Sequence, residues 1–142
     1  HRTLHTYLGS NMAVLAAAVA SIVLGFVWYG PLFGKTWAQL MGFDKKKMAE
    51  AKKKGMPKQT WVLMILGTLV TSYVLAHFVD YLDATNLAGA LQAGFWLWLG
   101  FIVPVQLGMV LWEGKPWKLY ILNVAYYLVN LSIMATILAL WA

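Results

Sequence analysis

Four long apolar segments constrain the fold of this chain more than any other feature of its sequence. They cover residues 11–29, 60–82, 87–112 and 116–141. A helix needs about 20 mostly apolar residues to cross the hydrocarbon core of a bilayer, and each segment meets that requirement. We therefore expect an all-α fold, an integral membrane four-helix bundle. It forms one domain over residues 11–142, with residues 1–10 as an extension outside the membrane.

The composition excludes several classes of protein. Apolar residues make up 61% of the chain and charged residues only 11%, whereas roughly 25% of an ordinary soluble domain is charged. A soluble enzyme or a nucleic-acid-binding module would need more charge to cover its surface. Cysteine is absent, which excludes disulfides, thiolate catalysis and cysteine-ligated metals. We expect membrane lipids as partners, and no nucleic acid, metal or cofactor.

The positive charge is concentrated in one loop. Eight of the 11 basic residues and two of the five acidic ones lie within residues 35–58, so this segment carries the whole formal charge of +6. Residues 44–54 favour a short helix along the membrane surface, which Gly55 and Pro57 would stop; a solvated, mobile loop is the alternative. Its lysines are predicted to contact lipid headgroups, or else to dock an acidic cytoplasmic partner. They are Lys45, Lys46, Lys47, Lys52, Lys53 and Lys54.

Two signals predict the orientation in the membrane. Loops rich in Lys and Arg stay cytoplasmic, which places the basic loop and the turn that carries Lys115 and Lys118 inside. Both termini are then outside. The tryptophans agree, because indole rings are enriched at membrane boundaries. Those near the predicted inner boundary are Trp28, Trp37, Trp61, Trp112 and Trp117.

Several stretches of the sequence resemble a known family. They are LGFVWYGPLFGKTW from Leu24 to Trp37, WLGFIVP from Trp98 to Pro104, and LWEGKPW from Leu111 to Trp117, followed by Asn123, Tyr126 and Tyr127. From about Asn11 onward, the chain resembles the small bacterial membrane proteins catalogued as domain of unknown function 1761. The resemblance implies a multi-pass protein of the bacterial cytoplasmic membrane. It implies no activity, and no catalytic or ligand residues carry over. Residues 1–10 fall outside it, as a native extension or a foreign remnant.

Polar side chains inside the spans are the candidate functional residues, because hydrocarbon penalises a polar group that lacks a partner. In the third span, Gln92, Gln106 and Glu113 share one stripe of a helix, and in the fourth span Asn123 and Asn130 lie seven residues apart near Tyr127. We expect the two stripes to face each other. They act either as interhelical hydrogen bonds that hold the spans together or as a polar path or binding pocket.

Three further patterns concern single helices. Pro104 frees the carbonyl of Gly100 in the third span, which predicts a kink there and leaves a functional hinge as an alternative. His77 and Asp80, at i and i+3, could sense external pH, or they are simply hydrated at the outer boundary. In the first span a small residue recurs at every fourth position, which lets helices approach closely. These residues, Ala13, Ala17, Ser21 and Gly25, pack against another span or against a second subunit.

These observations leave three hypotheses for function. The first is a non-enzymatic accessory or scaffold component that forms a homo-oligomer or belongs to a larger membrane complex. The second is a transporter or channel for ions or small molecules that uses the polar stripes of the third and fourth spans. The third is an enzyme acting on a lipid or quinone near His77 and Asp80. We expect no enzymatic activity, because the sequence holds no recognisable catalytic motif.

Overall fold

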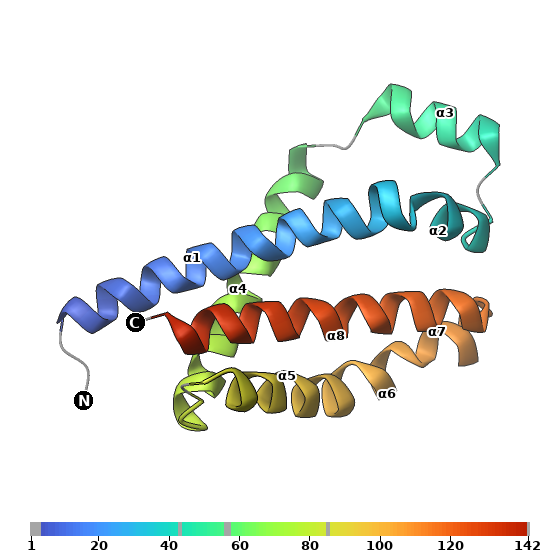
Figure 1. Ribbon diagram of the computed structural model, residues 1–142. Coiled ribbons are helices and arrows are strands. Elements are labelled where there is room, and N and C mark those ends of the chain that lie inside the picture. Colours follow the sequence, from blue (N-terminus) through green and yellow to red (C-terminus); the bar gives the residue numbers. More distant parts are fainter. Residues whose placement is uncertain (1–3, 43, 56–57, 85, 142) are drawn as a thin grey trace.

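The computed structural model describes residues 4–42, 44–55, 58–84 and 86–141, and the described chain is helical, with no strand (Figure 1). Four helical segments are long and apolar enough to cross a membrane. The first is α1 (Leu4–Val27) continued by η1 (Trp28–Leu32), the second is α4 (Lys58–Tyr81), and the fourth is α8 (Trp117–Leu140). The third is divided into α5 (Leu87–Phe101), α6 (Val103–Gln106) and α7 (Gly108–Leu111). Two further helices, α2 (Gly34–Leu40) and α3 (Lys45–Lys54), lie between the first and second spans.

The fourth span is the centre of the arrangement. Helix α8 lies between α1 on one side and α5–α7 on the other, and α4 crosses α1 and α8 (Figure 1). The start of α1 and the end of α8 lie at one end of the molecule, which we call the terminal end. Helices α2, α3 and α7 lie at the opposite end, which we call the lysine end. The basic loop and the turn before α8 are therefore at the same end.

Local sequence signals account for most helix boundaries. The side chain of Asn86 accepts a hydrogen bond from Gly89 N at 2.8 Å and so caps α5. Asp44 caps α3 in the same way, through Lys47 N at 2.7 Å. Helix α3 ends before Gly55, whose positive φ of 66° suits a residue without a side chain. The short helix expected over residues 44–54 is thus present, from Lys45 to Lys54.

The first span differs from its expected bounds at both ends. Helix α1 begins at Leu4, so residues 4–10 continue the helix as its first two turns; residues 1–3 lie outside the described residues. At the other end, Pro31 cannot donate a backbone hydrogen bond. The chain therefore widens into a π-helical turn, in which Phe33 N donates to Trp28 O at 2.9 Å. Helix α2 was not expected from the sequence.

The third span is broken at two points, one on each side of Pro104. The α-helical pattern stops at Ile102, whose φ is −109°, and stops again at Leu107. The hydroxyl of Tyr120 on α8 donates to Val103 O at 2.8 Å and so satisfies a carbonyl beside the first break. Gly100, which the sequence linked to the kink, is exposed, and a Cβ there would meet nothing within 4 Å.

Small and apolar side chains fill the terminal half of the bundle. Its buried cluster consists of Ala17, Leu75, Val79, Ala84, Ala90, Leu131, Met134 and Ala135. Helices α5 and α8 form the most extensive pair in the fold, and Gly94 is where their backbones approach. A Cβ at Gly94 would lie 3.4 Å from backbone atoms of Leu131. The indole of Trp98 also donates to Val124 O at 2.7 Å, which ties α5 to α8.

Candidate functional site

One polar connection at the lysine end joins three of the four spans. The Tyr29 hydroxyl of η1 donates to Asn123 Oδ1 of α8 at 2.7 Å. The amide nitrogen of Asn123 points to Met109 Sδ of α7, 3.8 Å away. Asn123 therefore uses both ends of its amide to hold the first and third spans against the fourth. This connection is a candidate site because a span rarely carries a polar amide without a structural or functional reason.

The π-helical turn places Tyr29 in this position. A Cβ on Gly34, at the start of α2, would lie only 2.8 Å from the carbonyl oxygen of Tyr29. Glycine is therefore needed at position 34 for α2 to fold back beside η1. Helix α2 then packs against α8, with Ala38 buried and the Trp37 ring 6.3 Å from that of Tyr29.

Aromatic rings surround the Tyr29–Asn123 hydrogen bond. The ring of Tyr126 lies 5.1 Å from that of Tyr29, 6.1 Å from Trp28 and 5.3 Å from Tyr127. The Tyr126 hydroxyl reaches α1, where a Cβ on Gly25 would lie 3.3 Å from its oxygen. We call Trp28, Tyr29, Asn123, Tyr126 and Tyr127 the aromatic–amide cluster. The indole nitrogen of Trp28 is buried and has no hydrogen-bond partner among the described residues.

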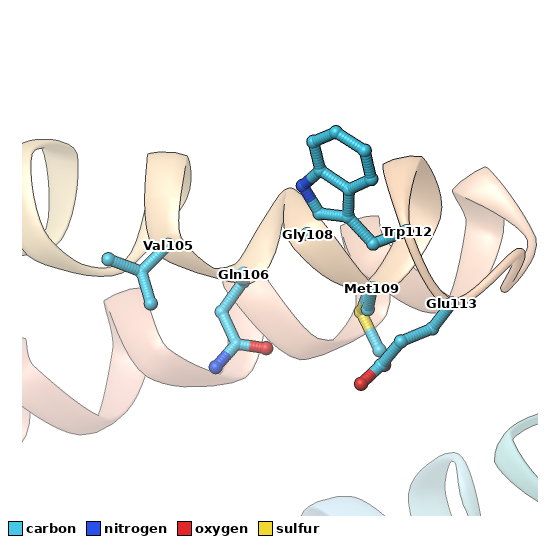
Figure 2. A pocket seen from close by; sticks show the side chains of 6 residues that line it. All are labelled: Val105, Gln106, Gly108, Met109, Trp112 and Glu113. Carbon is cyan, nitrogen blue, oxygen red and sulfur yellow. The ribbon is translucent and has the colours of Figure 1, made fainter.

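An open cavity of about 310 Å³ lies on the surface of α6 and α7, and it shares Met109 with the connection to Asn123 (Figure 2). Gln106 and Glu113 extend from the same side of these helices, and the Trp112 indole extends from the other side. The amide and carboxylate could accept hydrogen bonds from a ligand that carries an ammonium or hydroxyl group. The remaining lining residues are Val105 and Gly108.

The other polar residues predicted on the third and fourth spans do not join this cluster. Gln92 is exposed on α5, whereas α5 packs on α8 through Ala90, Ala93 and Gly94 on its opposite face. Gln92 thus lies away from the interface that the sequence predicted for it. Asn130 is buried in α8, and its Oδ1 has no hydrogen-bond partner among the described residues. The physical reason is that small residues, and not amides, allow the close approach of α5 to α8.

The predicted pair at the end of α4 is exposed. His77 Nδ1 lies 3.1 Å from the carbonyl oxygen of Tyr73, and its ring packs on the Tyr73 ring at 4.6 Å. A carbonyl accepts only, so this contact requires the proton on Nδ1. The side chain of Asp80 is exposed one turn further along. Within the described part of the chain, no three His, Cys, Asp or Glu residues gather into a metal site.

The small residues of α1 are used inside the chain. Ala13, Ala17 and Ser21 are buried, and Gly25 lies under the Tyr126 hydroxyl. Ser72 of α4 donates to Val14 O at 2.8 Å on the same helix. The sequence left open whether this stripe packs against another span or against a second subunit. In the structure, other spans of the same chain pack against it.

The six lysines predicted to contact lipid headgroups all belong to α3, at the lysine end. Of the six, Lys46, Lys47 and Lys53 have side chains that the structure describes, and all three are exposed. The side chains of the other three lie outside the described residues.

Trp28 and Tyr126 were not identified as site residues from the sequence, and neither were Tyr29 and Met109, the two residues that contact Asn123. Tyr29 belongs to the stretch that carries the family resemblance, so its position in that motif was an available signal. Met109 had none, because a methionine in an apolar span is ordinary. Both are brought to Asn123 by contacts over 94 and 14 residues of chain.

Comparison with known protein families identifies the family of this chain. A family model described as "Protein of unknown function (DUF1761)" matches residues 12–139. This chain belongs to the DUF1761 family. The family resemblance predicted from the sequence is thereby confirmed, and four membrane-spanning helices make the chain a multi-pass membrane protein. No curated protein and no solved structure matches it.

We expect Tyr29→Phe to loosen the contact between η1 and α8. The substitution removes the donor to Asn123 Oδ1 and leaves that acceptor unpaired, which costs about 0.5–1.5 kcal/mol for a hydrogen bond between spans. Tyr127→Phe is the matched control, because the Tyr127 hydroxyl makes no hydrogen bond with the described residues. Unfolding of both variants in detergent measures the difference. Equal stability of the two variants would show that the Tyr29–Asn123 bond contributes nothing.

Proposed function

We propose that this chain is a non-enzymatic accessory component of the bacterial cytoplasmic membrane that associates with other membrane chains through its third span. The observation that carries the proposal is the exposure of the most apolar stretch of this span, even though α5 packs closely on α8. Only 6% of its most apolar stretch is buried, against 17% to 28% for the other three spans. The third span therefore keeps an exposed apolar face beside its contact with α8.

The outer face of α5 has the composition of a contact surface. It consists of Ala88, Gln92, Phe95, Trp96 and Leu99, which are all exposed and recur at helical spacing. An amide on a face turned to hydrocarbon is stabilised when it hydrogen-bonds to another helix. Large aromatic side chains contribute much of the energy at protein interfaces. Gln92 and Trp96, one turn apart, combine these two properties.

The packing of the terminal half also favours association over transport. A solute path through the chain would have to pass the cluster of alanine, leucine, valine and methionine side chains around Met134. This apolar cluster lies between the polar residues that a path would have to connect. Asn123 is at the lysine end, and Gln92 is exposed on the outer face of α5. The proposed orientation, with both termini outside and the lysine end in the cytoplasm, follows from the lysines of α3 and of the turn before α8.

Photo-cross-linking in the native membrane tests this proposal. A photoreactive phenylalanine at position 96 samples the outer face of α5, and the same residue at position 70 samples α4. Trp96 and Val70 are matched positions, because both are near the middle of a span and are 65% and 61% exposed. We expect a defined cross-linked band from position 96, which Gln92→Leu weakens, and a weaker one from position 70. Equal, diffuse cross-linking from both positions would refute association through α5.

A transporter is the second candidate, because the two breaks of the third span lie beside the cavity that Gln106 and Glu113 line. Broken helices often line transport sites. Liposomes that hold only the purified chain distinguish the two functions. We expect no gain of solute flux over empty liposomes. A flux that Gln106→Leu and Asn123→Leu abolish would favour the transporter and overturn the accessory role.

A further inference from the structure

Helix α3 carries an uncompensated positive charge. Six of its ten residues are lysines and only one, Glu50, is acidic. The nearby Asp44 is engaged at the start of the helix, where its carboxylate accepts from Lys47 N at 2.7 Å. All the side chains of α3 that the structure describes are exposed, and the helix lies apart from the packed spans (Figure 1). Lys46, Lys47 and Lys53, whose side chains the structure describes, form no ion pair with an acidic side chain among the described residues.

The connections of α3 hold it close to the membrane boundary. Four residues separate it from α2 and three separate it from α4, which allows at most about 14 Å and 10 Å of extended chain. Trp37 on α2 and Trp61 on α4 lie just beyond these links, and indole rings are enriched at the membrane interface. Surface charge acts over a Debye length of about 8–10 Å. The lysines are therefore held within reach of the headgroups.

The residue types in α3 indicate a charged surface and not a specific protein partner. The helix contains lysine and no arginine, and arginine is the residue that recognises single carboxylates or phosphates through paired hydrogen bonds. Its apolar residues are only Met48, Ala49 and Ala51, so it lacks the aromatic anchors that dominate protein interfaces. Lysines that make up six of ten residues, at both ends of a short helix, suit a layer of diffuse negative charge.

We propose that α3 binds the anionic phospholipids of the adjacent leaflet through its lysines. The glycines that bracket it, Gly42 with φ of 83° and Gly55 with φ of 66°, end α2 and α3 and let the helix change direction on both sides. A helix of ten residues is marginal in water, and its like charges repel one another. Anionic headgroups remove that repulsion, so lipid binding also stabilises the helix. This proposal does not depend on association through α5.

The test uses the full chain and one lipid at a time. Native mass spectrometry of the detergent-solubilised protein gives apparent affinities for phosphatidylglycerol and for phosphatidylcholine. Amide hydrogen exchange in nanodiscs of phosphatidylcholine, with and without phosphatidylglycerol, reports the helicity of residues 45–54. The variant K46Q/K47Q/K53Q removes three exposed charges, and K46R/K47R/K53R keeps them. Thermal unfolding of both variants confirms that the spans are intact.

We expect the wild-type chain to bind phosphatidylglycerol more tightly than phosphatidylcholine and to slow exchange in α3 when the anionic lipid is present. Each lysine near an anionic leaflet contributes about fivefold, so the glutamine variant, which lacks three, loses about 100-fold in affinity while the arginine variant loses little. High salt weakens the binding. Equal affinities for the two lipids, or an unchanged glutamine variant, would overturn the proposal. So would protection of α3 that appears only when an acidic cytoplasmic protein is added.

Discussion

Replacing Gly94 with leucine will separate α5 from α8. A Cβ at position 94 already lies 3.4 Å from the carbonyl carbon and oxygen of Leu131 and from Ser132 N. The atoms beyond Cβ in leucine would have to occupy the backbone of α8, which cannot yield as a side chain can. Overpacking of this kind typically costs about 1–3 kcal/mol, or more where the backbone is the obstacle. The contact at stake is the most extensive pair of helices in the fold.

Gly94→Ala is the matched control, because 3.4 Å is an ordinary contact distance for the one atom that it adds. The chain has no cysteine, so Ala90→Cys, at a fully buried position of α5, supplies a single thiol to report on the interface. We expect a membrane-permeant thiol reagent to label this cysteine quickly when it is combined with Gly94→Leu. Labelling stays slow when Ala90→Cys is combined with Gly94→Ala or with the native glycine. Slow labelling in all three backgrounds would mean that α5 and α8 do not depend on close approach at this position.

The second large effect is expected at the lysine end, from Gly34→Ala. The added Cβ would lie 2.8 Å from the carbonyl oxygen of Tyr29, closer than nonbonded atoms approach, so α2 must move away from η1. Because Tyr29 donates to Asn123 and Ala38 of α2 is buried, this movement disturbs the aromatic–amide cluster as a whole. We expect a loss of about 1–3 kcal/mol in unfolding free energy.

Gly30→Ala tests whether the effect belongs to this contact. Gly30 lies in the same π-helical turn, and a Cβ there meets nothing within 4 Å. Alanine also has the higher helix propensity, so this variant keeps or slightly raises stability. Unfolding in detergent compares the two variants. A loss of stability in Gly30→Ala as large as in Gly34→Ala would show that the turn needs glycine for its flexibility and not for the close approach to Tyr29.

The sequence determined the features that depend on neighbouring residues. Apolar segments of bilayer length predict the four spans, and short-range chemistry sets the ends of helices. Asn86 caps α5, Asp44 caps α3, and Pro31 lies in the π-helical turn that follows α1. The break near Pro104 is of the same kind, because a missing backbone donor acts on its own turn. These effects reach only to the next turn of the helix, so the local sequence contains the information needed to predict them.

Only the tertiary structure decided which faces meet. A period of seven put Gln92, Gln106 and Glu113 on one stripe, but periodicity does not say which stripe faces a neighbour. The close fit at Gly94 turned α5 so that Gln92 points away from α8, and the break at Ile102 interrupts the helix between Gln92 and Gln106. The partner of Asn123 was likewise set by packing, since Tyr29 comes from a helix 94 residues distant. Such contacts depend on side-chain volumes in several helices at once, which no single segment of the sequence specifies.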